Sequence, residues 1–125
     1  MKQQRPVNLD LTTFKFPPTS IVSILHRGSG FILFLVIPII LRALELSLES
    51  VQGYASITAW ADSLLCRFIL GAAAGALFYH VVAGLRHLVM DMGFCETLET
   101  GTLSAKIALG LGLGGAVLIF LMILF

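Results

Sequence analysis

Charged residues are scarce in this chain of 125 residues, where they make up 12% of the sequence. An ordinary soluble domain carries roughly 25%. Hydrophobic residues account for 58%, and a soluble domain of this size still exposes about a third of the surface of its unfolded chain, so it could not bury that much apolar area. The composition excludes a free soluble globule and predicts a membrane protein.

Other features are also missing. The net charge is only +1 and no basic run is present, which argues against nucleic acid as a partner. Neither Cys66 nor Cys95 belongs to a CxxC or CxxCH pattern, which excludes iron–sulfur ligation and covalent haem attachment by this chain. The two cysteines fall toward opposite ends of one predicted helix, too far apart for a disulfide. The first twenty residues lack an apolar stretch with a cleavage site, so we expect no signal peptide.

What the sequence does contain is three long uncharged stretches, at 28–41, 68–85 and 107–125. A membrane-spanning helix needs about 20 mostly apolar residues. We therefore predict an all-α membrane protein with three transmembrane helices. The predicted segments are an N-terminal tail at 1–20, helices at 21–45, 62–91 and 103–125, and loops at 46–61 and 92–102.

Local signals support these limits. Pro17 and Pro18, followed by Thr19 and Ser20, are typical of a helix start. Gly101, with hydroxyl residues after it, predicts the start of the third helix. Two GxxxG spacings, Gly71 to Gly75 and Gly110 to Gly114, favour close helix packing in lipid and offer surfaces to a second chain.

The distribution of Lys and Arg predicts the orientation. Six of the eight lie in the tail, at the start of the first helix or beside the 92–102 loop, whereas only Arg42 and Arg67 flank the 46–61 loop. The positive-inside rule then places the N-terminus and the 92–102 loop in the cytoplasm and the C-terminus in the periplasm. We expect a multi-pass protein of the bacterial inner membrane.

His80 is the ionisable residue predicted to lie deepest in the membrane. It precedes Asp91 by eleven residues, roughly 16 Å along a helix axis, and ionisable residues within spans are candidates for function. Small residues share or border its face, which suits a flat porphyrin whose iron binds a neutral imidazole nitrogen. These small residues are Ala73, Ala76, Ala83 and Gly84. The alternative is a histidine hydrogen-bonded to a neighbouring helix, with the alanines serving packing, and both interpretations stay open.

A cationic layer is predicted nearer the cytoplasm than His80. Its members are His26, Arg27, Arg86 and His87. The anionic propionates of a haem would find strong hydrogen bonds there, although arginines that merely snorkel to the lipid headgroups are an alternative. Because no other histidine is expected at the depth of His80, a six-coordinate haem needs a second ligand from elsewhere. We therefore expect this chain to pack against a second membrane subunit.

Ser23 and Arg27 are four residues apart and share one face of the first helix. A hydroxyl and a guanidinium at the membrane boundary can hold a quinone carbonyl and stabilise negative charge on its reduced oxygen. The alternative is that Ser23 bonds local backbone while Arg27 meets lipid phosphate.

Three segments together are specific: RPVNLDL in the tail, SILHRGSG at the start of the first helix and HVVAGLRHLVMD at the end of the second. They resemble the cytochrome b membrane-anchor subunit of bacterial succinate dehydrogenase. The resemblance implies a second, smaller anchor subunit that shares one haem b and a ubiquinone site with this chain. It also implies a flavoprotein that oxidises succinate and an iron–sulfur subunit that passes the electrons on.

The resemblance also implies residue roles. His80 matches the axial ligand of the haem iron, with the other axial histidine supplied by the smaller anchor. His26 and Arg27 match propionate contacts, Ser23 and Arg27 match the quinone site, and His87 matches a histidine with a propionate or structural role. Two alternatives remain: the haem-binding anchor of a related quinol:fumarate reductase, and a haem-free structural or assembly protein.

Overall fold

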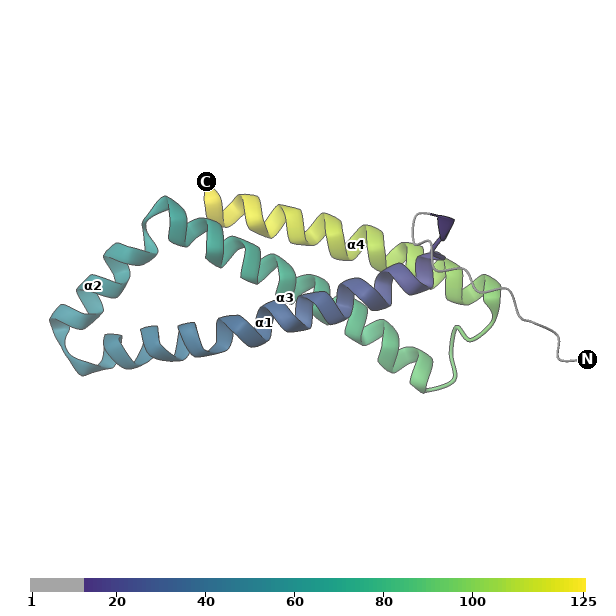
Figure 1. The fold of residues 1–125 in the computed structure, drawn as a ribbon, viewed down its shortest axis with the longest axis horizontal. Coiled ribbons are helices and arrows are strands. Elements are labelled where there is room, and N and C mark those ends of the chain that lie inside the picture. The colour runs from purple at the N-terminus through teal and green to yellow at the C-terminus, as the bar shows by residue number, and fades with distance from the viewer. Residues whose placement is uncertain (1–12) are drawn as a thin grey trace, which may run out of the picture.

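The structure, a computed structural model, describes residues 13–125, which form four helices (Figure 1). The helices are α1 (Pro18–Glu49), α2 (Val51–Ala61), α3 (Leu64–Asp91) and α4 (Leu98–Leu124). The RPVNLDL segment and most of the predicted tail lie outside the described residues. The prediction of an all-α protein is confirmed for the part of the chain from residue 13 onward.

Three of these helices are long and apolar enough to cross a membrane, namely α1, α3 and α4. They contain 32, 28 and 27 residues, and each exceeds the 20 or so that a bilayer core requires. With 11 residues, α2 is about 17 Å long, too short to span the bilayer. The three predicted spans are therefore confirmed as helices of suitable length and composition.

The helix limits differ from the predicted ones. α1 begins at Pro18, in the first turn, where proline's missing N–H is not needed for a backbone bond. The segment 46–61, predicted as a loop, is helical over Val51–Ala61, and the Ser50 hydroxyl caps it by accepting a hydrogen bond from the Gly53 N–H at 2.9 Å.

α4 likewise starts earlier than its predicted start near Gly101. The Thr97 hydroxyl accepts a hydrogen bond from the Thr100 N–H at 3.2 Å and caps the helix before Leu98. Gly101 lies inside the first turns of α4, where an ideal Cβ would approach the carbonyl oxygen of Cys95 to 3.0 Å. The glycine therefore allows the preceding turn to pack closely against the helix. The prediction that the third helix starts at Gly101 was wrong.

The end of α3 is closed by a left-handed glycine. Gly93 has φ +86°, and its N–H donates to the Met90 carbonyl at 2.9 Å while the Phe94 N–H donates to the Val89 carbonyl at 3.2 Å. These two bonds form a Schellman motif, which satisfies carbonyls that the helix leaves open. The chain then turns back and runs as α4 antiparallel to α3.

α3 packs most extensively against α4 and is crossed by α1, which also contacts α4 (Figure 1). Glycines bring α3 and α4 together, because a Cβ at Gly71 would lie 3.2 Å from the carbonyl oxygen of Phe120 and a Cβ at Gly75 only 2.8 Å from that of Ala116. By contrast, Cβ atoms at Gly110 and Gly114 would meet nothing within 4 Å. The first GxxxG spacing is thus used inside the chain, and only the second is open to a partner.

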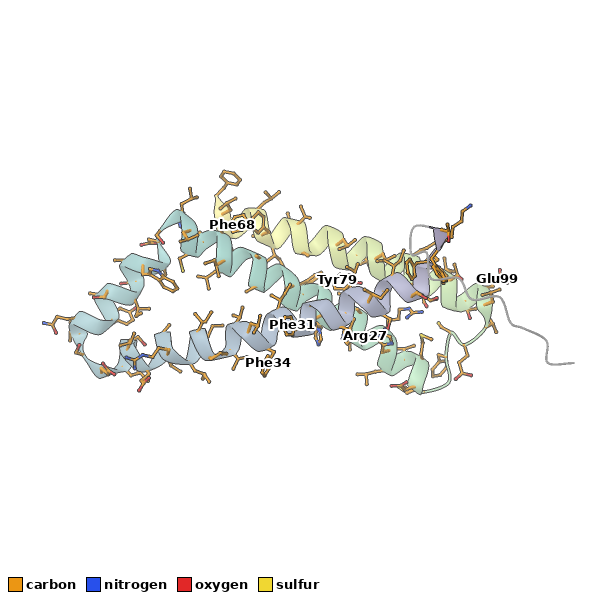
Figure 2. The ribbon with its side chains drawn as sticks, in the orientation of Figure 1. Arg27, Phe31, Phe34, Phe68, Tyr79 and Glu99 are labelled. Atoms are coloured by element: carbon orange, nitrogen blue, oxygen red, sulfur yellow. The ribbon has the colours of Figure 1, made fainter. Side chains whose placement is uncertain are left out.

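Few side chains are buried. Five buried hydrophobic residues form one cluster, namely Val22, Tyr79, Ala83, Ala105 and Ala108, and Cys66 is buried apart from them. Large apolar side chains instead point outward along α1, where Phe31 and Phe34 are 63% and 68% exposed (Figure 2). Apolar area of this extent fits contact with lipid or with another membrane chain rather than with water.

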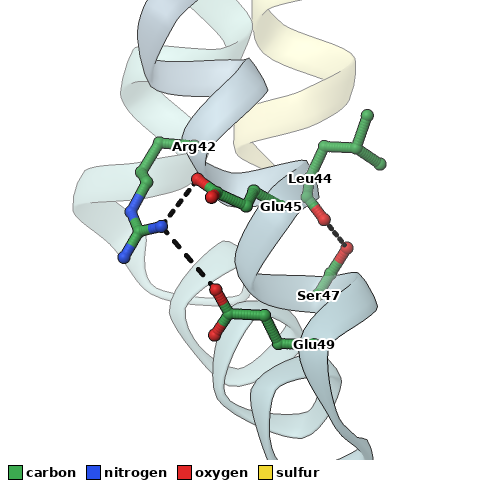
Figure 3. Close-up of polar contacts among 5 residues, drawn as sticks. All are labelled: Arg42, Leu44, Glu45, Ser47 and Glu49. Atoms are coloured by element: carbon green, nitrogen blue, oxygen red, sulfur yellow. Dashed lines mark hydrogen bonds and ion pairs between the residues drawn. The ribbon is translucent and has the colours of Figure 1, made fainter.

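A small set of charges lies at the end of the molecule away from the α3–α4 turn. Arg42 contacts Glu45 at 2.6 Å and Glu49 at 3.8 Å (Figure 3), and Arg67 contacts Asp62 at 3.3 Å. All of these side chains are at least two-fifths exposed, and exposed pairs contribute little to stability. The three carboxylates neutralise the positive charge of the two arginines at that end.

Candidate functional site

Three histidines meet where the first half of α1 crosses the second half of α3. The rings of His26 and His80 are stacked, with centroids 4.0 Å apart and an interplanar angle of 18°. His87 is tilted against His26 at 5.2 Å and 53°. We call His26, His80 and His87 the histidine cluster. The sequence placed His26 in a layer above His80, but in the structure the two rings are in contact.

Two glycines allow this contact. A Cβ at Gly30 on α1 would lie 3.0 Å from His80 Cε1, and a Cβ at Gly84 on α3 would lie 3.2 Å from His26 Nε2. Each histidine therefore lies against the glycine of the opposite helix, four residues beyond the histidine of that helix. The sequence indicated this contact through two H-x-x-x-G patterns, since a histidine and a glycine four residues apart share a helix face.

The Nδ1 atom of His80 is held by α1. It lies 3.1 Å from the Ser29 hydroxyl oxygen and 3.1 Å from the His26 carbonyl oxygen, and the Ser29 hydroxyl itself donates to that carbonyl at 2.7 Å. Because the serine proton is directed to the carbonyl, the network assigns the imidazole proton to Nδ1. The lone pair of Nε2 is then the one available to a metal, so His80 fits a haem ligand.

Ser23 and Arg27 form a separate pair on α1, as their spacing predicted. The Arg27 guanidinium donates to the Ser23 hydroxyl at 3.2 Å and to the Ser23 carbonyl at 3.3 Å. Arg27 is exposed and reaches out from the helix (Figure 2). The pair borders an open groove of about 370 Å³, lined by Phe16, Thr19, Ser20, Ser23, Ile24 and Arg27. A donor pair beside an open, partly apolar groove suits a flat ligand with a carbonyl oxygen.

Arg86 does not join the other predicted members of the cationic layer. Its guanidinium donates to the Ser104 hydroxyl and to the Gly101 carbonyl, both at 3.1 Å, and the residue is only 7% exposed. It therefore ties α3 to the start of α4. The reason is angular: Arg86 follows His80 by six residues, about 240° around a helix, whereas His87 follows by seven and returns to nearly the same face.

Sequence reasoning assigned no role to Ser29 or to Tyr79. The Tyr79 hydroxyl donates to the Val22 carbonyl at 3.4 Å across the α1–α3 crossing, and its ring lies against Gly112 of α4. Tyr79 precedes His80 directly, so this anchor limits how far α3 can move beside the histidine cluster. Within residues 13–125, no three His, Cys, Asp or Glu side chains are arranged to hold a bare metal ion.

The three long apolar helices define a multi-pass membrane protein, and the histidine cluster lies between two of these helices. Residues 1–121 match the family described as succinate dehydrogenase/fumarate reductase transmembrane subunit. The chain belongs to this family, as a cytochrome b membrane subunit of succinate dehydrogenase.

Individual relatives agree over most of their length. The succinate dehydrogenase cytochrome b556 subunit of Coxiella burnetii is 40% identical over 110 residues, which cover 84% of this chain and 85% of the relative. The cytochrome b560 subunit of Reclinomonas americana is 36% identical over 118 residues, or 89% and 81% of the two chains. The cytochrome b556 subunit of Paracoccus denitrificans is 32% identical, over 82% and 78%. The resemblance seen in the sequence is confirmed.

Proposed function

We propose that this subunit binds haem b through His80 and forms part of the quinone-reducing site of succinate dehydrogenase. The observation that carries the haem assignment is the fixed Nδ1 of His80, because a histidine that donates from one ring nitrogen presents the other as a metal ligand. The relatives named cytochrome b556 are further support. A bound haem b supplies a one-electron redox centre.

The residues around His80 also suit the propionates and the second axial position of a haem b. The His26 ring is stacked on His80 and the His87 ring is tilted against His26, so both lie near the proposed ligand and can donate hydrogen bonds to propionates. This chain offers His80 as one axial ligand, and we propose that a second, smaller membrane subunit donates the other. The uncovered apolar side chains of α1 and the open Gly110–Gly114 stretch of α4 support such a partner.

Ser23 and Arg27 are proposed to bind ubiquinone. The hydroxyl and the guanidinium can donate to one quinone oxygen, and the positive charge stabilises the negative charge that this oxygen gains on reduction. The bond between the two side chains keeps both donors at the same place on α1. Their groove opens at the surface, as a site completed by other subunits requires.

The proposed orientation in the membrane is supported by the distribution of Lys and Arg along the chain. The start of α1 and the α3–α4 turn lie at the same end of the molecule (Figure 1), and in the sequence six of the eight Lys and Arg residues precede, belong to or flank these two segments. We propose that this end faces the cytoplasm of a bacterium and meets the iron–sulfur subunit, which receives electrons from the flavoprotein. This chain performs no chemistry on succinate; it anchors those subunits to the inner membrane and supplies part of the quinone site.

The haem assignment is tested with two histidine variants of the complex, purified through a tag on this chain. We expect His80→Ala to remove the b-type α-band from the reduced-minus-oxidised spectrum, because the iron loses a ligand. His87→Ala is the comparison variant and should retain the band, because it removes a proposed propionate contact and leaves the proposed iron ligand His80 in place. An unchanged spectrum in His80→Ala, in a complex with all its subunits, would refute the assignment.

The quinone assignment is tested with Arg27→Ala. We expect electron transfer from succinate to ubiquinone to fall at least tenfold, since removing one donor at a developing oxyanion costs about 10²–10³ in rate. Succinate oxidation by a soluble dye should not change. Arg42→Ala, an exposed arginine at the other end of the same helix, is the control and should leave both rates intact. Equal loss of both activities in Arg27→Ala would argue against a quinone role.

A further inference from the structure

The hydroxyl of Ser29 links the two helices of the histidine cluster. It donates to the His26 carbonyl of its own helix at 2.7 Å and lies 3.1 Å from His80 Nδ1 of α3. Ser29 is only 7% exposed, and it is one of two polar or charged residues buried in the described part of the chain. A buried hydroxyl with these two contacts is placed to act on the imidazole of His80.

Ligand histidines commonly donate from the nitrogen that does not bind the metal. The acceptor fixes the tautomer, orients the ring and makes the ligating nitrogen more basic. Around His80 the acceptors are the Ser29 hydroxyl oxygen and the His26 carbonyl oxygen, each 3.1 Å from Nδ1. Both belong to α1, so the orientation of a ring carried by α3 is set by the neighbouring helix.

We propose that Ser29 is the positioning residue for His80, holding Nδ1 as the donor so that Nε2 faces the haem iron. This inference rests on the proposed role of His80 as a haem ligand. His26 contributes through its backbone carbonyl, independently of its ring. Ser29 touches neither substrate nor iron and acts only through the imidazole.

Gly30 supports the same arrangement. A Cβ at this position would lie 3.0 Å from His80 Cε1 and 3.5 Å from His80 Nδ1, so a side chain there would displace the ring from Ser29. The adjacent residues Ser29 and Gly30 therefore hold the imidazole and make room for it, respectively.

The bond from Ser29 to its own helix does not explain the cross-helix contact. Ser47, also on α1, makes the same type of bond to the carbonyl three residues earlier, at the same 2.7 Å, and it is a local contact within one exposed stretch of helix. Ser47 therefore provides a matched control: Ser47→Ala removes an equivalent hydroxyl and the same backbone bond without touching the histidine cluster.

The experiment compares Ser29→Ala and Ser47→Ala in the assembled complex. Haem transfer to excess apomyoglobin measures the dissociation rate, and a redox titration of the α-band measures the midpoint potential. We expect haem loss about tenfold faster in Ser29→Ala, the lower end of the effect of removing a partner of a ligating histidine. The potential should rise, because a less basic imidazole stabilises ferric iron less. Ser47→Ala should match the unsubstituted complex in both.

A second pair keeps the test decisive if Ser29→Ala fails to assemble. Ser29→Thr and Ser29→Val introduce side chains of the same shape, of which only threonine keeps the hydroxyl. Faster haem loss and a higher potential in the valine variant than in the threonine variant would support the inference. Equal values in the two, or a Ser29→Ala complex indistinguishable from Ser47→Ala, would overturn it.

The outcome for His80→Ala distinguishes the proposed positioning role of Ser29 from the proposed ligand role of His80. If that variant loses its haem while Ser29→Ala is unaffected, the positioning role fails and the ligand assignment stands. If His80→Ala keeps its haem unchanged, the proposed function fails, and the role of Ser29 fails with it.

Discussion

Gly75→Ala is predicted to weaken the packing of α3 against α4. The added Cβ would lie 2.8 Å from the carbonyl oxygen of Ala116, below the 3.4 Å at which ordinary van der Waals contact begins. Because the obstacle is backbone and not the end of a flexible side chain, the two helices must separate. Overpacking of this kind costs about 1–3 kcal/mol.

Gly114→Ala provides the reference for this magnitude. It lies on α4 where a Cβ meets nothing within 4 Å, so it gains the same helix propensity, up to about 1 kcal/mol, without a clash. The difference between the two variants therefore isolates the close approach. We expect Gly75→Ala to be less stable than Gly114→Ala by about 1–3 kcal/mol.

The assay is unfolding of the subunit in mild detergent by increasing fractions of SDS, followed by the circular dichroism of its helices. The free energies of unfolding of the two alanine variants are compared directly. Equal values would show that α3 and α4 do not approach closely at Gly75, and the reasoning from the glycine contacts would then be refuted.

Two further predictions concern the contacts that join the helices. Arg86→Lys should lower the midpoint of thermal unfolding and speed proteolysis in the 92–97 turn, because an ammonium group lacks the planar fork that reaches two acceptors at once; a midpoint and cleavage rate equal to those of the unsubstituted subunit would contradict this role. Tyr79→Phe should cost only about 0.5–1.5 kcal/mol in the same SDS titration, because it removes one neutral hydrogen bond of 3.4 Å. A loss of several kcal/mol would mean that Tyr79 does more than join α3 to α1.

The spans could be predicted from the sequence because hydropathy alone determines them. An uncharged stretch of membrane length has few alternatives to a spanning helix, and α1, α3 and α4 follow the three predicted ones. α2 was missed because an eleven-residue helix carries no such signal. The Ser50 cap was its sequence cue, but serine is also common in loops.

The candidate site was predictable in part. Ser23 and Arg27 were paired correctly because the contact lies within one helix, where four-residue spacing fixes geometry. The stacking of His26 on His80 depends on how α1 and α3 cross, and a single sequence does not give that crossing. Arg86 was grouped with His87 because the two are adjacent near the end of α3 that was predicted to face the cytoplasm, although their angular positions on the helix differ by about 100°.

Ser29 is part of the SILHRGSG segment, but the sequence predicted no role for it, because the partner of its hydroxyl, His80, lies on another helix. A serine within a helix ordinarily bonds its own backbone, and Ser29 does so as well. Only the position of the His80 ring distinguishes it from Ser47. Most of the features of the candidate site that could not be predicted from the sequence thus depend on contacts between helices.

We propose above all that this chain carries a haem ligand at His80. The most direct test of this claim is the haem b content of the detergent-solubilised complex, purified through a tag on this chain and read from the dithionite-reduced minus oxidised spectrum. We predict a b-type α-band equivalent to one haem per complex, and its loss in His80→Ala. An intact complex without haem would contradict the claim, and only the anchoring role would remain.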